Sequence, residues 1–425
     1  MSAPRAARNR WNAPGVLILS RLAAVALGFV SAPLVARALG PDGRGVLAAV
    51  LAAAFILPIV LGLGLPVEVR RKASVGIIGP ELRAARDLLW MAFVPSTAAG
   101  IAIAVALLHN QDQSLLVTAA VCIALAPASL WWMIDTGVLI GRGSYGSVAI
   151  LQVLPPLFTL FVVTVLFAVG QLTVGSALIA STSGQIANSV VSTLLVRVGF
   201  RGKRRARFEM LRTSLKYWGN AVADAVTNRL DQVIALPILG AYQAGLYSVA
   251  VTIGGLPAAV GQSLGGTFFR SIATTEGEAR RHEVALAIRV SLLAGVLAAG
   301  LIALLAPWGV PFVFGAEFTD STLPTLLYLI GSALGVGGYV ASLALAAIGF
   351  GWRMTLAQMI GLAVGLVGLL SLGPFLGADG AAIASTVGFA AAAIGMVLGL
   401  KVRLVDLIPR LADGRTLVAR LRHGV

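Results

Sequence analysis

The residues with the clearest potential for chemistry lie in residues 218–251, an apolar stretch that the sequence predicts to include a membrane-spanning helix. Near the middle of that helix are Asp224, Arg229 and Asp231. A charged side chain at the centre of a bilayer costs roughly 3 kcal/mol on insertion scales, so it persists only where it faces a cavity or a partner inside a bundle. The sequence therefore predicts that something polar is handled inside the membrane.

Four polar residues of this helix recur at intervals of four, four and three positions: Asn220, Asp224, Asn228 and Asp231. Because successive residues of a helix are rotated by about 100°, these four line one side of it. Arg229 lies about 160° around the helix from Asp231. We therefore expect Arg229 to point at a neighbouring helix, or into the same cavity from its flank.

Two other predicted helices carry polar groups. Arg21 lies on the first helix, as Arg229 lies on the seventh. One face of the sixth helix carries a stripe of residues spaced four, three and four apart: Ser181, Gln185, Asn188 and Ser192. This stripe has two interpretations, hydrogen bonding between helices or the lining of a cavity. For the buried charges a functional role is favoured, because a structural ion pair would not need several polar stripes around it.

Composition defines the class of protein. The chain is 58% hydrophobic and 12% charged, with a mean hydropathy of +0.93. These values leave too few charges to cover a soluble surface, and apolar runs repeatedly reach the roughly 20 residues that span a bilayer. A single cysteine and three scattered histidines predict no metal site, no redox centre and no cofactor. The expectation is an all-α polytopic membrane protein.

Twelve membrane helices are predicted, as two parallel six-helix repeats around a central cavity. The expected division is a cytoplasmic N-terminus (1–13), an N-terminal half (14–196), a basic linker with an interfacial helix (197–216), a C-terminal half (217–400) and a basic amphipathic tail (401–425). The helices are expected at residues 14–38, 43–66, 88–108, 115–139, 147–169, 173–196, 217–239, 243–268, 284–305, 323–348, 353–373 and 378–400.

The basic residues predict the orientation. Of the 32 lysines and arginines, 28 fall in the termini and in the loops on one side of this bundle. Under the positive-inside rule that side is cytoplasmic, and both termini lie there. The net charge of +15 then needs no nucleic-acid partner to explain it.

The two halves resemble each other at an offset close to 200 residues. Leu39-Gly40 followed by Gly45 matches Leu239-Gly240 followed by Gly245, and residues 179–182 match residues 383–386. Six crossings return the chain to its starting side, so the halves have the same orientation. Binding sites in such folds lie between the halves near the membrane midplane.

Several of these motifs resemble those of a known family. The segments that carry the resemblance are Asn12 with Ser20-Arg21, residues 36–45, residues 228–231, residues 239–240, residues 245–250 and residues 312–318. The chain resembles, over residues 10–400, the bacterial polysaccharide and lipid-linked oligosaccharide flippases of the multidrug/oligosaccharidyl-lipid/polysaccharide exporter superfamily. It departs from them at Arg44, where the family usually has an aromatic residue.

The resemblance implies a transporter of the bacterial plasma membrane, not an enzyme, that moves a polyprenyl-(pyro)phosphate-linked saccharide to the outer leaflet. Arginine suits the phosphate because its planar fork gives two charge-assisted hydrogen bonds. The candidate substrate-binding residues are Arg21, Arg229, Asn228, Gln185 and Asn188. Asp224 and Asp231 are expected either to orient the arginines or to bind a coupling proton or sodium ion.

The expected partners are the lipid-linked saccharide, membrane lipids, and a polysaccharide polymerase or glycosyltransferases. Two alternatives stay open. A multidrug or cation antiporter of the same superfamily would use Asp224 and Asp231 as its substrate and ion site, and a non-transporting membrane scaffold would tolerate apolar replacements of the buried charges.

Overall fold

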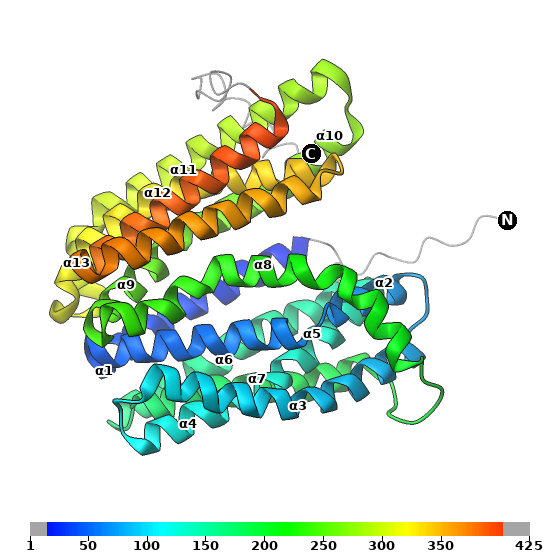
Figure 1. Ribbon diagram of the computed structural model, residues 1–425, viewed down its shortest axis with the longest axis horizontal. Helices are drawn as coiled ribbons and strands as arrows, with labels where there is room; N and C mark the ends of the chain where they lie inside the picture. Colours follow the sequence, from blue (N-terminus) through cyan, green and yellow to red (C-terminus); the bar gives the residue numbers. More distant parts are fainter. Residues whose placement is uncertain (1–14, 403–425) are drawn as a thin grey trace. The chain divides into compact units, whose positions relative to one another are not determined.

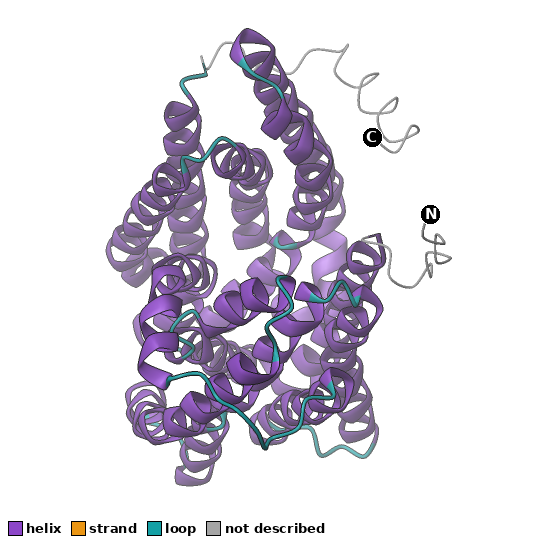
Figure 2. Cartoon of the chain, turned by 90° about the vertical axis from the view of Figure 1, so that its right-hand side faces the viewer, coloured by secondary structure: helices purple, strands orange, loops and turns teal. Residues whose placement is uncertain are grey.

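The computed structural model describes residues 15–402, which form helices joined by short loops, with no strand in that range (Figures 1 and 2). The predicted N-terminal segment (1–13) and most of the predicted tail (401–425) lie outside the described residues. The described chain divides into two compact units. Unit 1 holds residues 15–39 and 46–233, and unit 2 holds residues 40–45 and 234–402.

The first eight helices supply unit 1, although α1 and α8 also give residues to unit 2. Their bounds are α1 (Gly15–Leu61), α2 (Leu65–Ser74), α3 (Gly79–Leu108), α4 (Gln113–Ala124), α5 (Ala126–Gly141), α6 (Tyr145–Ala168), α7 (Val174–Val196) and α8 (Arg207–Leu239). In this unit α3 packs on α4, α2 on α5, and α7 on both α5 and α6. The core at one end is aliphatic, with Leu82, Leu89, Leu130, Ile134 and Leu151 fully buried.

Local sequence signals fix several helix ends in unit 1. Pro80 stands in the first turn of α3, where the missing N–H of proline leaves no helical hydrogen bond unmade. Thr173 caps α7 in a reciprocal arrangement with Ser176, in which each side chain accepts from the other residue's backbone N–H. The start of α3 at Gly79 and the start of α7 at Val174 therefore coincide with these two sequence signals.

The last part of the chain builds unit 2. After the end of α8 come α9 (Ala241–Gly254), α10 (Leu256–Thr274), α11 (Gly277–Phe314), a short 3-10 helix (Ala316–Ser321), α12 (Thr322–Ala347) and α13 (Gly351–Leu400). In this unit α12 packs on α11, α13 and α10. The core at one end of it is built from α10 to α13, with Phe268, Ile288, Val340, Leu345 and Val397 buried.

Two of these helices change direction at a glycine. Backbone dihedrals of φ 64°, ψ −177° at Gly40 divide α1, and φ 57°, ψ −131° at Gly377 divide α13. Side chains other than hydrogen rarely allow such angles. Each of the two long helices therefore supplies two antiparallel segments. If α4 with α5 and α9 with α10 are each taken as a single crossing, the predicted ranges fall on helix with one exception. The second range (43–66) runs past the end of α1 at Leu61, through a turn at residues 62–64 and into α2.

The turns at the two matching glycine motifs pack against each other in unit 2. Gly240, at φ 78° and ψ 168°, has nearly the same backbone conformation as Gly40. A Cβ atom on Gly45 would overlap the carbonyl oxygen of Ala241, and one on Gly245 would overlap that of Pro41. The contacts thus pair residues 41 and 45 with 241 and 245, an offset of 200 that agrees with the offset of the sequence motifs.

Three predicted helices begin earlier in the structure than expected. The third begins at residue 79 instead of 88, the seventh at 207 instead of 217, and the ninth at 277 instead of 284. In each case the added turns are rich in charged residues, so hydropathy alone misses them. Residues 207–216 of the predicted linker are the first turns of α8. The compact units divide within α8 rather than at this linker, and the division into sequence repeats stays a prediction.

The surface is that of a membrane protein. Seven helical stretches in the described residues are long and apolar enough to cross a bilayer. Three predicted spans are not among these seven stretches: 173–196, 217–239 and 243–268. The first, α7, carries a polar stripe, and the second, part of α8, carries charges. The third is divided between α9 and α10 at Gly255. Large apolar side chains are exposed along the helices, among them Phe161, Trp308 and Phe375. The all-α polytopic prediction is confirmed.

Candidate functional site

All seven predicted site residues belong to unit 1, on α1, α7 and α8. On α8, the side-chain amide of Asn228 donates to the backbone oxygen of Asp224 at 2.7 Å and to its carboxylate Oδ1 at 3.3 Å. Both side chains are exposed, and Asp231 is half-buried. The side chain of Asn220, the first member of the predicted stripe, lies outside what the structure describes. The middle of the stripe is thus a linked polar pair one helical turn apart.

Arg21 lies near this pair. Its guanidinium attracts the carboxylate of Asp224 electrostatically, and its side chain is exposed on α1. The preceding residue, Ser20, is buried and donates to Oε1 of Gln152 on α6 at 2.7 Å. This hydrogen bond ties α1 to α6 next to Arg21, so the backbone that carries the arginine is held in place while its side chain remains accessible.

Arg229 points at a neighbouring helix, one of the two expected orientations. Its guanidinium carbon lies 5.4 Å from the ring centroid of Phe55, on the second segment of α1. A guanidinium above an aromatic face is attracted by the ring's quadrupole, an interaction of about 0.5–1 kcal/mol at an exposed site. The Arg229 side chain is itself exposed. The stacking orients the guanidinium, and its N–H groups remain available to an anion.

The polar stripe of α7 is largely turned inward. Oε1 of Gln185 accepts a hydrogen bond from Nε1 of Trp132 at 2.8 Å, and Ser189 donates to the backbone oxygen of Ala128 on α5. Ser192 donates to the carboxylate of Asp135 at 2.8 Å. For these members of α7, hydrogen bonding between helices is therefore the role that the structure shows.

Asn188 is different from the rest of the stripe. Its side chain is fully buried, and neither its amide nitrogen nor its amide oxygen has a hydrogen-bond partner within the described residues. A buried polar group without a partner costs about 1–3 kcal/mol. Gly184, one turn earlier, faces the Pro155 carbonyl and the Phe158 ring of α6. In this conformation Asn188 is closed off from a substrate.

Sequence reasoning missed a buried ion pair in unit 1. Nη2 of Arg86 on α3 donates to Oδ1 of Asp135 on α5 at 3.0 Å, and the two side chains are 4% and 0% exposed. Nη1 of Arg86 donates to the backbone oxygen of Val198, and the guanidinium lies over the rings of Trp131 and Phe200 at 5.2 and 4.8 Å. Ser192 satisfies the second oxygen of the carboxylate. This closed centre ties α3, α5 and α7 together.

Both members of the pair had a signal in the sequence. Asp135 is a lone carboxylate within the predicted fourth helix, and so meets the criterion that singled out Asp224. The third helix was expected to begin at residue 88, which leaves Arg86 in the loop before it. In the structure Arg86 lies inside α3 and is buried, so that helix start was wrong.

A second ionic network lies in the predicted cytoplasmic part of unit 1. Arg205 donates to Glu68 at 3.2 Å, to Glu81 at 3.0 Å and to Glu209 at 2.7 Å, and so ties the linker to α2, α3 and α8. Burial of Glu68 raises the pKa of its carboxyl, but hydrogen bonds from Arg71 and Arg205 outweigh that effect and hold the pKa below its ordinary value. Burial lowers the pKa of Arg205, and its carboxylate partners more than reverse this.

Comparison of the sequence with protein families decides the family. The profile of the family described as "polysaccharide biosynthesis protein" matches residues 12–266, which is more than half of the 425-residue chain. The chain belongs to this family. The matched range includes Arg21, the α7 stripe and the whole of α8. A comparison with curated proteins finds no significant match.

Solved structures resemble this family member over most of its length. The lipid II flippase MurJ, in an inward closed conformation, matches with a TM-score of 0.73 and 13% identity, covering 92% of this chain and 88% of MurJ. An inward-facing multidrug resistance MATE family transporter of the MOP superfamily matches with a TM-score of 0.65 and 16% identity, covering 90% and 97%.

A third match is a MOP superfamily transporter from Pyrococcus furiosus, with a TM-score of 0.61 and 16% identity, covering 92% of this chain and 98% of that transporter. At these identities the likeness shows the fold, which is that of MOP superfamily transporters. The family match confirms the resemblance that the sequence motifs indicated.

Proposed function

We propose that this member of the polysaccharide biosynthesis family is a flippase, which moves a polyprenyl-(pyro)phosphate-linked saccharide from the inner to the outer leaflet by alternating access. The observation that carries the proposal is the guanidinium of Arg229, which lies within the predicted membrane span of α8. It is exposed, and it lies over the ring of Phe55 on α1. A phosphate leaving water requires a fixed counter-charge, and a pre-oriented guanidinium supplies one with two parallel hydrogen bonds. Arg21 supplies a second exposed guanidinium.

The neighbouring polar residues fit the same role. Asn228 and Gln185 each have amide N–H groups for sugar hydroxyls, although one N–H of Asn228 is already directed at Asp224. Asn188 joins them only if α7 and α6 move apart, because it is closed off in this conformation. Such a movement would relieve its unsatisfied amide. Asp224 and Asp231 are proposed either to orient the arginines or to bind the coupling proton or sodium ion.

The proposed setting is the bacterial plasma membrane, with both termini cytoplasmic, in the service of cell-surface polysaccharide synthesis. A polymerase or glycosyltransferases would supply or consume the lipid-linked saccharide there. MurJ, whose fold this chain shares, is described as a lipid II flippase, which supports a substrate of this chemical class.

A cation antiporter is the second candidate, favoured by the exposed carboxylate of Asp224 and by the likeness to MATE transporters. The two candidates differ in the sign of charge that the site attracts. The transporter from Pyrococcus furiosus is described as having a binding pocket of reverse polarity, which suggests a different function for it. The charge of the site is thus the property to test here.

The test is transport of a fluorescently labelled lipid-linked saccharide in proteoliposomes. Arg229→Ala should abolish outer-leaflet appearance of the label, and Arg229→Lys should recover only part of it, because an ammonium cannot reproduce the planar fork. Arg212→Ala is the matched control, since Arg212 is an exposed arginine on the same helix but outside the predicted span. Wild-type transport by Arg229→Ala would refute the assigned role, and loss in both variants would show a general effect of charge.

A further inference from the structure

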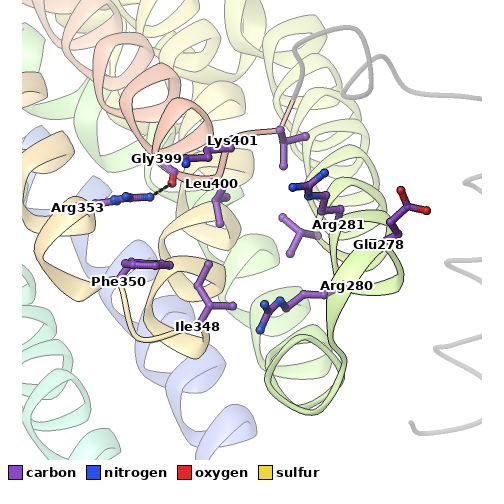
Figure 3. Close-up of a pocket in the computed structure, with 12 residues that line it drawn as sticks. Glu278, Arg280, Arg281, Ile348, Phe350, Arg353, Gly399, Leu400 and Lys401 are labelled. Atoms are coloured by element: carbon purple, nitrogen blue, oxygen red, sulfur yellow. Dashed lines mark hydrogen bonds between the residues drawn. The ribbon is translucent and has the colours of Figure 1, made fainter.

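A cavity of about 380 Å³ lies in unit 2, remote in sequence from the residues assigned to transport (Figure 3). Its walls are the first two turns of α11, the loop at residues 348–350, and both ends of α13. The two ends of α13 lie together because the helix reverses at Gly377. The cavity therefore lies in unit 2 where the start of α11 and the two ends of α13 meet.

The charges around this cavity are mostly positive. It is lined by Arg280, Arg281, Arg353 and Lys401, with Glu278 as the one carboxylate. In Figure 3, Arg280 and Arg281 extend from α11 toward the opposite wall, Arg353 approaches from that wall, and Glu278 points away. Within residues 15–402, none of the four cations takes part in an ion pair. Four like charges around one space repel each other unless an anion enters it.

The ends of the helices add to this positive field. α11 and α13 both begin at the cavity, and neither has a side-chain cap on its first turn. Unsatisfied N–H groups at a helix N-terminus favour an anion. The last turn of α13 also reaches the cavity, but its Gly399 carbonyl is satisfied by Nη1 of Arg353 at 2.9 Å. The remaining N–H groups of Arg353 stay available.

Aromatic and apolar groups indicate the kind of anion. The guanidinium of Arg353 lies 4.4 Å from the ring centroid of Phe350 and 5.5 Å from that of Trp352, and these rings are 39% and 64% exposed. Exposed tryptophan beside arginine and lysine is typical of the membrane–water interface. Val284, Ile348 and Leu400 line the same cavity. A ligand with a charged phosphate and an apolar remainder fits both kinds of wall.

We propose that this cavity binds the phosphate group of an anionic phospholipid at the cytoplasmic surface of the membrane. Basic pockets between membrane helices recognise such head groups through charge, with the acyl chains remaining in the bilayer. A soluble phosphate ion has the same charged group and would bind to the same basic side chains. The site is separate from the proposed transport residues, and its occupancy is measurable without any transport assay.

The test uses the purified full-length protein in detergent, titrated with phosphatidylglycerol or with phosphatidylcholine, and native mass spectrometry to count bound lipid. The variant Arg280→Ala/Arg281→Ala should lower the affinity for phosphatidylglycerol by about thirtyfold, at roughly 1 kcal/mol for each basic residue. The matched control Arg201→Ala/Lys203→Ala removes the same charge from exposed residues of the linker in unit 1. Its affinity should equal that of the wild type.

Equal binding of phosphatidylglycerol by the wild type and by the cavity variant would overturn the proposal. Equal binding of the two lipids by the wild type would overturn it as well. Inorganic phosphate separates the two sources: if it binds and the lipid does not, the ligand is soluble phosphate and the lipid assignment is wrong. Should the double variant aggregate, the single variants Arg281→Gln and Lys401→Gln, at exposed side chains, give the same comparison.

Discussion

Replacing Asp135 with alanine should destabilise unit 1 strongly, because it leaves the Arg86 guanidinium buried without a counter-charge. Arg86 would retain its hydrogen bond to the Val198 carbonyl and its two aromatic contacts, none of which supplies a negative charge. Breaking one partner of a buried ion pair costs about 3–5 kcal/mol. Ser192 loses its carboxylate acceptor but keeps its hydrogen bond to the backbone oxygen of Ser189 at 2.9 Å, so its hydroxyl adds little to the cost. The expected loss therefore lies within that range.

The neighbouring residue of α3 provides a matched control. Asp87 pairs with Arg204 at 3.1 Å and Arg207 at 3.2 Å, and both arginines are about half exposed. The Asp87 side chain is 15% exposed, but both of its partners reach solvent, which screens each pair to about 0.2–1 kcal/mol. Asp87→Ala should therefore cost much less stability than Asp135→Ala. The measurement is equilibrium unfolding of the purified protein in mixed micelles, with increasing sodium dodecyl sulfate and circular dichroism as the signal.

A second variant tests the stated cause. Arg86→Met/Asp135→Leu removes both charges and keeps apolar volume, and such replacements of buried pairs are often neutral or stabilising. We expect it to recover most of the stability that Asp135→Ala loses. If Asp135→Ala unfolds at the same detergent fraction as Asp87→Ala, the electrostatic reasoning about the buried pair is refuted.

Three other predictions follow from the structure. Gly245→Ala should lower stability by about 1–3 kcal/mol, because its Cβ meets the backbone of Pro41, whereas Gly300→Ala, in open space on α11, should be neutral or slightly stabilising; unfolding curves of the two compare them. The pKa of Glu68 is lower in the folded protein than in the unfolded chain, where it is about 4.3. The ionised carboxylate therefore contributes stability above that pH, and this stability is lost as the pH falls through the folded pKa. Glu68→Gln should flatten the acid side of a plot of melting temperature against pH. Gln111→Cys should react with an impermeant thiol reagent from outside the cell and Gly79→Cys should not; the reverse would overturn the predicted orientation.

The sequence was sufficient for the order of the twelve long apolar helical stretches, because hydropathy and turn residues are local properties. It missed α2, a short charged helix that falls mostly between the second and third predicted helices. It was insufficient for three helix starts, where charged turns extend beyond the apolar stretch. The segment 207–216, part of the predicted interfacial helix, illustrates the reason: Met210 and Ser214 are buried, while Phe208 is exposed. Which face a helix buries depends on its neighbours, and a single sequence does not define them. The interfacial role of this segment stays a prediction.

For the candidate site, the sequence predicted which residues share a face of a helix but not which residues are buried or paired. Helical periodicity placed Asp224 and Asn228 on one face, and the hydrogen bond between them agrees with that. The same periodicity did not show that Asn188 points into the packing of unit 1, nor that Asp135 has Arg86 as its partner. Periodicity gives the angle of a residue around its own helix, whereas burial and pairing depend on the other helices of the bundle.

The most direct test of the proposed function compares two substrates in one preparation of the unmutated protein. Proteoliposomes are loaded either with a fluorescent polyprenyl-pyrophosphate-linked saccharide or with a cationic dye, with and without imposed proton or sodium gradients. The proposal predicts protein-dependent appearance of the lipid in the opposite leaflet and no transport of the dye. Transport of the dye without any flipping of the lipid would contradict it and would assign the protein as a cation antiporter.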